Sequence, residues 1–164
     1  MDYDLINAQL DALIHDEPHF LPNLCNASAL LFDSLPDLNW AGFYLKILTD
    51  TSGKPNGKSE LLLGPFQGKT ACIRIPYGKG VCGTSAEQDK IQRVADVHLF
   101  PGHIACDSAS ASEIVIPLHA RDGQVVGVLD LDSPVKDRFS PEDEEGLAVF
   151  ARILEQHCDL HPLS

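Results

Sequence analysis

Three cysteines in the middle of the chain stand where their thiols could react. Cys72, Cys82 and Cys106 lie in the segments ACIRIPYGKG, GKGVCGTS and FPGHIACDSAS, among glycine, proline and other small residues. A cysteine that serves only packing is usually buried among aliphatic neighbours, whereas these three occupy loop-like sequence in which a thiol is accessible. Three functions are open to such a group: thiol redox chemistry, metal binding and structural disulfides.

The number of cysteines and the start of the chain argue against structural disulfides. Five is an odd number of cysteines, so they cannot all be paired in a closed disulfide framework. The start, MDYDLINAQLDALIHDEP, is acidic and has no basic region followed by an apolar one, so we expect no signal peptide. The sequence thus predicts a cytoplasmic protein, and disulfides that only stabilise the fold are rare in that compartment.

Zinc binding is the weaker alternative for these thiols. The ligands would be a histidine together with the three cysteines, drawn from Cys72, Cys82, Cys106, His98 and His103. The sequence has no C-x-x-C pair and no usual spacing of zinc ligands. We therefore expect no metal and no cofactor.

Size and charge exclude several classes of function. With 164 residues, the chain is long enough for one domain with a substantial core. It carries 12 basic and 24 acidic residues, for a net charge of −12, and has no basic cluster that could neutralise phosphates. No apolar run approaches the length that crosses a bilayer. We expect neither a nucleic-acid partner nor a membrane partner.

Apolar periodicity predicts an α+β domain. It indicates helices over 4–15, 20–35 and 81–88, and the Ser-Pro-Glu-Asp run at 140–143 begins a further helix that ends near 157. Strands are expected at 39–48, 61–67, 71–75, 91–95, 112–119 and 124–132, with a polar hairpin loop at 49–60. The parts of this single domain, 1–164, are N-terminal helices (1–36), a sheet with active-site loops (37–135) and a closing helix (140–158). The sheet is expected to be mostly antiparallel, with the helices packed on one face.

Strand periodicity gathers three acidic side chains. Asp130 and Asp132 are two residues apart on one strand, so they point to the same face. Glu113 lies on the hairpin partner and can join them, while Trp40 and Tyr44 share a face of the first strand. We expect a pocket with carboxylates, an aromatic wall and nearby thiols. The alternative is that the two aspartates only solvate one face of the sheet.

Four longer motifs resemble the free methionine-(R)-sulfoxide reductases, which are GAF-domain enzymes. They are NWAGFYL at 39–45, GPFQGKTACIRIPYGKGVCGTS at 64–85, VADVHLFPGHIACDSASASEIVIPL at 94–118 and GVLDLDSP at 127–134. The resemblance implies a GAF-like fold, a homodimer in contact through the outer helices, and free methionine sulfoxide as substrate. It also implies a catalytic Cys106, resolving thiols at Cys82 and Cys72, and a substrate pocket made of Trp40, Tyr44, Glu113, Asp130 and Asp132.

The chemistry of that family suits these residue types. A thiolate attacks the sulfoxide sulfur and becomes a sulfenic acid, a second thiol then forms a disulfide, and an external dithiol such as thioredoxin reopens it. His103 could favour ionisation of Cys106, whereas the nearby carboxylates oppose it. Glu113 or Asp132 would hold a proton for the sulfoxide oxygen, and Asp130 would bind the substrate ammonium.

A non-catalytic sensor that binds a small molecule is the alternative from another class, because GAF-like domains often only bind ligands. Formation of methionine from the sulfoxide would separate the two functions. The remaining cysteines, Cys25 in the second helix and Cys158 at the end of the last one, are expected to serve packing.

Overall fold

A six-stranded sheet in the order β3-β2-β1-β6-β5-β4 forms the centre of the computed structural model, which describes residues 1–102 and 108–164. Every neighbouring pair of strands is antiparallel. The strands are β1 (Trp40–Thr49), β2 (Pro55–Gly68), β3 (Arg74–Pro76), β4 (Gln92–Val94), β5 (Ser112–His119) and β6 (Val125–Ser133).

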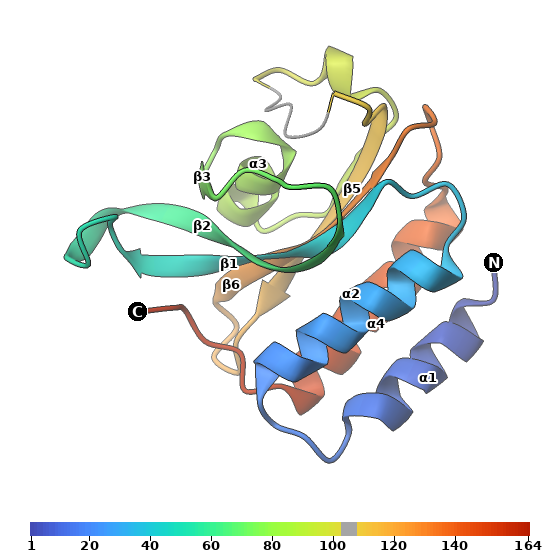
Figure 1. Cartoon of the computed structure of the whole chain (residues 1–164), viewed down its shortest axis with the longest axis horizontal. Coiled ribbons are helices and arrows are strands. Elements are labelled where there is room, and N and C mark those ends of the chain that lie inside the picture. Colours follow the sequence, from blue (N-terminus) through green and yellow to red (C-terminus); the bar gives the residue numbers. More distant parts are fainter. Residues whose placement is uncertain (103–107) are drawn as a thin grey trace.

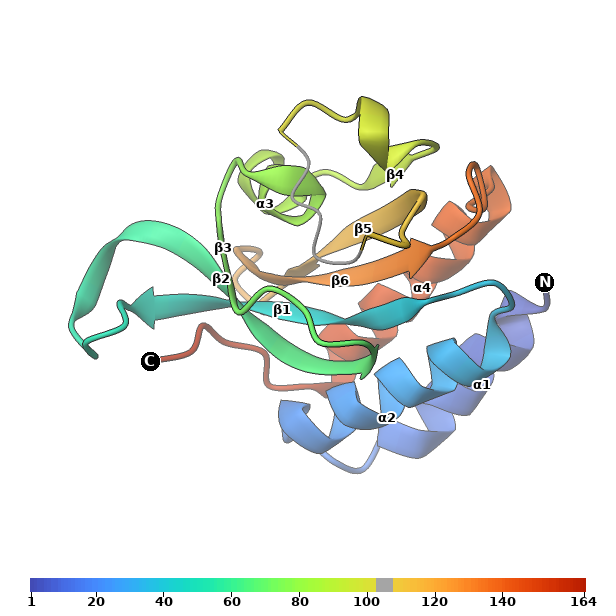
Figure 2. The ribbon, with the colours of Figure 1, turned by 45° about the horizontal axis from the view of Figure 1, so that its top comes forward.

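The three longer helices cover one face of this sheet (Figures 1 and 2). They are α1 (Tyr3–Ile14), α2 (Phe20–Ser34) and α4 (Pro141–His157). The shorter α3 (Gly80–Gln88) and the 3-10 helix η1 (Val97–Leu99) lie on the opposite face. The α+β class and the antiparallel sheet are therefore confirmed. The helix expected at 81–88 is present as α3, but it lies on the face opposite to the three longer helices.

The alternation of side chains along the strands divides the interior into two apolar clusters. Leu129 and Leu131 of β6 point towards the long helices and pack with Leu147 and Phe150 of α4. On the other face, Trp40 and Tyr44 of β1 and Val115 of β5 pack with residues of α3. The second cluster is smaller, and the pocket described below opens beside it.

The segment at 49–60, expected as a polar loop, is mostly strand. Its turn is confined to 50–54, where the backbone N–H of Asp50 donates to the carbonyl of Lys54 at 2.8 Å. The Asp50 carboxylate accepts from the backbone N–H groups of Ser52 and Lys54. Because the acid closes the turn so tightly, β2 begins at Pro55.

The closing helix begins as the sequence predicts. The Ser140 hydroxyl accepts from the backbone N–H of Asp143, and the Asp143 carboxylate accepts from the backbone N–H of Ser140, which is a capping box. Within the described ranges, none of the helices is long and apolar enough to cross a membrane.

Candidate active site

A pocket on the α3 face of the sheet collects most of the residues that the sequence singled out. Six of them line it: Trp40, Tyr44, Cys82, Glu113, Asp130 and Asp132. The other lining residues are Thr70, Ala71, Ile75, Lys79, Gly80, Val81 and Ser110. Cys72 lies next to the pocket rather than in its lining, and Cys106 lies outside the described residues.

The register of three adjacent strands explains why these side chains meet. Asp132 of β6 is paired with Trp40 of β1 on one side and with Glu113 of β5 on the other. Asp130 follows two residues earlier, opposite Gly42 and Val115. Side chains at these positions share one face of the sheet. An aromatic ring, two aspartates and a glutamate are thereby placed side by side.

The aromatic wall is fixed by stacking and by hydrogen bonds to the backbone. Trp40 stacks on Tyr44 and Phe66, with ring centroids 5.8 and 5.2 Å apart. Its Nε1 donates to the carbonyl of Lys69 at 3.2 Å. The Tyr44 hydroxyl donates to the carbonyl of Cys72 at 3.0 Å, which holds that cysteine at the edge of the pocket. Cys72 is disulfide-bonded, whereas Cys82 is free.

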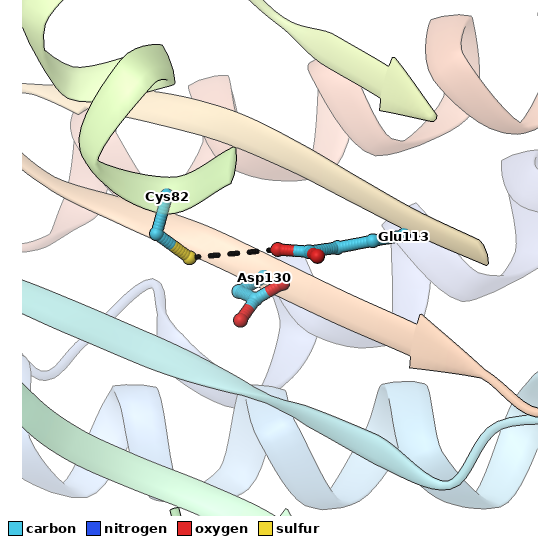
Figure 3. Close-up of side chains that lie close together, drawn as sticks. All are labelled: Cys82, Glu113 and Asp130. Atoms are coloured by element: carbon cyan, nitrogen blue, oxygen red, sulfur yellow. Dashed lines mark hydrogen bonds between the residues drawn. The ribbon is translucent and has the colours of Figure 1, made fainter. Parts of the chain in front are cut away.

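The start of α3 brings the Cys82 thiol to the carboxylates (Figure 3). Its Sγ lies 3.9 Å from Oε1 of Glu113. The helix approaches β3 so closely that a Cβ on Gly83 would lie 2.3 Å from the carbonyl oxygen of Pro76. Cys82, Glu113 and Asp130 are 4%, 6% and 5% exposed. The helix expected at 81–88 is present and Cys82 stands in its first turn, but the accessible thiol expected from the glycine-rich setting is wrong, because Cys82 is buried.

Burial and mutual repulsion alter the acidity of this cluster. Burial raises the pKa of Asp130 to about 7. Burial, followed by the charges of Asp130 and Asp132, raises the pKa of Glu113 well above its usual range. The Cys82 thiol has a raised pKa for the same reasons, burial first and then the charge of Asp130. The raised pKa values favour the protonated carboxyl of Glu113 and the thiol form of Cys82.

Comparison with known proteins fits this arrangement. Residues 21–158 match the GAF domain family. The free methionine-R-sulfoxide reductase of Escherichia coli is 52% identical to the chain over 94% of its length and 87% of that protein. The chain belongs to the free methionine-R-sulfoxide reductases.

Solved structures of this reductase family have the same fold. The fRMsr of Staphylococcus aureus in complex with substrate is 48% identical, with a TM-score of 0.83 and coverage of 95% of each chain. The free methionine-R-sulfoxide reductase of Neisseria meningitidis in complex with its substrate is 41% identical, with a TM-score of 0.84, and the match covers 94% of this chain and 87% of that one.

Some side chains differ from the sequence-based expectation or were missed by it. Cys158 is buried as expected, but Cys25 is exposed, because the buried face of α2 runs through Leu24, Ala27 and Leu31. Sequence reasoning also missed Lys79 as a pocket residue; its place between two glycines was the available signal. The predicted aid of His103 to Cys106 concerns two residues outside the described ranges.

Proposed function

We infer that this chain reduces free methionine-(R)-sulfoxide to methionine through a cycle of cysteine oxidation and reduction. The observation that carries this inference is the pocket itself, which joins three carboxylates, an aromatic wall and two cysteines in a member of this reductase family. The similar structures of the reductases from Staphylococcus aureus and Neisseria meningitidis were solved in complex with substrate.

We propose that the carboxylates divide the work of substrate recognition. Asp130 binds the ammonium of the free amino acid, because its buried Oδ1 has no hydrogen-bond partner among the described residues. Glu113 and Asp132 face the sulfoxide oxygen. Trp40, which lines the pocket, receives the S-methyl group, and its ring contacts the substrate sulfur. A residue within a peptide lacks the ammonium and would bind poorly.

The first chemical step is attack by the Cys106 thiolate on the sulfoxide sulfur. Glu113 gives its proton to the oxygen as the bond between sulfur and oxygen breaks. The attack forms a bond between the two sulfur atoms, and the protonated oxygen leaves as hydroxide. Hydroxide then adds to the Cys106 sulfur as the bond between the two sulfur atoms breaks, so methionine leaves and Cys106 becomes a sulfenic acid, with two electrons passed from the cysteine to the substrate. Cys82 is a poor candidate for this attack because burial keeps it protonated.

Cys72 resolves the sulfenic acid in this scheme. Its thiol attacks the oxidised sulfur of Cys106, a disulfide forms and water leaves. The disulfide-bonded state of Cys72 and the free state of Cys82 support Cys72 as the first resolving residue, with Cys82 as a second thiol that can take over the disulfide. Thioredoxin, or another dithiol, then returns both cysteines to thiols.

The setting of the protein is also a proposal. Thiols that must be reduced again after each turnover suit the cytoplasm, where thioredoxin operates. A homodimer through the outer helices is supported by three exposed leucines on α1 and α2, namely Leu5, Leu13 and Leu21. Sedimentation of the Leu13→Glu variant tests this contact, since a monomer is expected.

Methionine release under single-turnover conditions tests the function. Reduced protein mixed with free methionine-(R)-sulfoxide should yield methionine, the Cys106→Ser variant should yield none, and Cys25→Ser is the matched control. With thioredoxin present, Cys72→Ser should form about one methionine per chain before turnover slows. A full yield from Cys106→Ser would overturn the assigned nucleophile, and binding without methionine from the unaltered chain would favour the sensor.

A further inference from the structure

Cys82, Glu113 and Asp130 place one thiol and two carboxylates around a common point (Figure 3). A ligand atom from each, the Cys82 sulfur and one oxygen of each acid, lies within 4.8 Å of the other two. All three residues are buried. We propose that they form a binding site for a thiophilic divalent cation such as Zn²⁺.

The distances suit such an ion. Zn²⁺ binds thiolate sulfur at about 2.3 Å and carboxylate oxygen at about 2.0–2.2 Å, almost always with tetrahedral geometry. A sulfur and an oxygen on the same ion are then roughly 3.5 Å apart. Sγ of Cys82 and Oε1 of Glu113 are 3.9 Å apart without an ion. A small movement of the three side chains is enough to close them around one cation.

The Asp130 carboxylate gives a second and independent reason to expect a cation at this site. Asp130 is 5% exposed, and its Oδ1 atom has no hydrogen-bond partner among the described residues. A buried oxygen without a donor costs free energy, so this atom favours a positively charged ligand. The side chain lines the pocket together with Cys82 and Glu113, which directs that preference to this group.

The donor set selects the kind of cation. Mg²⁺ and Ca²⁺ prefer sites built of oxygen, whereas a thiolate beside carboxylates suits Zn²⁺ and Co²⁺. Cys82 binds as the thiolate and the two acids bind as carboxylates, so the protons that these three groups hold pass to solvent when the ion enters, and no oxidation or reduction takes place. Among the described residues that line the pocket, Lys79 is the only basic one, so one cation beside the group would have little positive charge near it.

The consequence for the enzyme rests on the proposed function. Asp130 was assigned to the substrate ammonium and Glu113 to the sulfoxide oxygen, and both are ligands of the ion. The cation and methionine sulfoxide therefore exclude each other from the pocket. The ion acts as a competing ligand that also shields the Cys82 thiol, and it takes no part in the reaction.

Titration with Co²⁺ tests the site directly, because a thiolate on Co²⁺ gives a charge-transfer absorption in the near ultraviolet. The full chain with its Cys72 disulfide intact should show this band, and Zn²⁺ should remove it. Cys82→Ser should abolish the band, while Cys25→Ser, which removes the exposed thiol of α2, should keep it. Asp130→Asn should retain the band with affinity weaker by at least about tenfold.

The outcomes are distinguishable from those of the functional proposal. Absence of the band in the unaltered chain, or its survival in Cys82→Ser, would overturn the site. If Cys82→Ser does not fold, protection of Cys82 from alkylation by Zn²⁺ in the unaltered chain replaces that arm, and unchanged alkylation would overturn the site. Zn²⁺ that saturates the site without slowing methionine formation would overturn the competition alone. Failure of metal-free protein to form methionine would count against the function and not against the ion.

Discussion

Asp143 and Asp130 are two aspartates with equal solvent exposure and different electrostatic surroundings. Each is 5% exposed, Asp143 at the start of α4 and Asp130 in β6 beside the pocket. The Asp143 carboxylate accepts from the Tyr3 hydroxyl at 2.7 Å, from the Ser140 backbone at 2.8 Å and from Arg138 at 3.0 Å. Oδ1 of Asp130 has no hydrogen-bond partner among the described residues.

The pKa values of the two residues differ accordingly. Burial alone would raise the pKa of Asp143, but the hydrogen bonds from Ser140 and Tyr3 and the charge of Arg138 outweigh it and lower that pKa. Burial raises the pKa of Asp130 to about 7, because it outweighs the side-chain hydrogen bonds with Cys82 and Glu113 that lower that pKa. A buried carboxylate thus stabilises the fold where donors surround it, and it is ready for a ligand where they do not.

The largest expected effect is on the pocket side, in Glu113→Gln. The amide keeps the shape of the side chain but cannot transfer a proton to the sulfoxide oxygen, so kcat should fall by about 10²–10⁴-fold. KM should change much less. Steady-state kinetics with thioredoxin measure both constants. An unchanged kcat would remove Glu113 as the proton donor.

On the helix side, Asp143→Asn should damage stability and leave the chemistry intact. The change removes the negative charge that pairs with Arg138, whose side chain is only 13% exposed, and turns one acceptor into a donor. The expected loss in free energy of unfolding is about 3–5 kcal/mol, measured by urea denaturation. The kcat of the folded fraction should stay the same, and a fall as large as that of Glu113→Gln would refute the division between the two sides.

Asp130→Asn is the matched change in the pocket. It removes the charge that we assign to the substrate ammonium, so KM should rise by about tenfold to a hundredfold, since a hydrogen bond to a charged group contributes roughly 1.5–3 kcal/mol. The free amino acid should also lose its advantage over a peptide that contains methionine sulfoxide. Equal KM values for the variant and the unaltered chain would assign the ammonium to another group.

The helix start that holds Asp143 and the strand that holds Asp130 could largely be predicted from the sequence. The Ser140 cap and the alternation of Asp130 and Asp132 with Leu129 and Leu131 depend on local periodicity, and the structure confirms both. The α3 layer depends on a contact between Gly83 and Pro76 that no periodic pattern reveals. For the same reason, the burial of Cys82 was not foreseen.

The electrostatic contrast could not be predicted from the sequence. Both aspartates are ordinary acids in it, and the donors around Asp143 include Tyr3, which is 140 residues away along the chain. Cys25 shows the same limit at the level of a helix face. It lies within the apolar pattern of α2, but which residues of that pattern are buried is decided by how α2 packs on the sheet.

The smallest effect, and the one most specific to the contrast, is on the pH dependence of stability. Because the pKa of Asp130 is raised in the folded protein, from 3.8 to about 7, the folded state binds more protons than the unfolded state in that interval. Its contribution to stability is thus present at low pH and is lost as pH rises through about 7, with a slope of at most about 1.4 kcal/mol per pH unit. The lowered pKa of Asp143 acts in the opposite direction, and its contribution is lost as pH falls.

Urea denaturation between about pH 5 and pH 8 should therefore show a flatter profile and greater stability at the upper end for Asp130→Asn than for the unaltered chain. Asp143→Asn should run parallel to the unaltered chain over this range, because the pKa of Asp143 is lowered from 3.8 and its contribution is lost only at lower pH. A profile of Asp130→Asn that is also parallel to that of the unaltered chain would mean that the two carboxylates do not differ in acidity, and the contrast between them would then have no electrostatic basis.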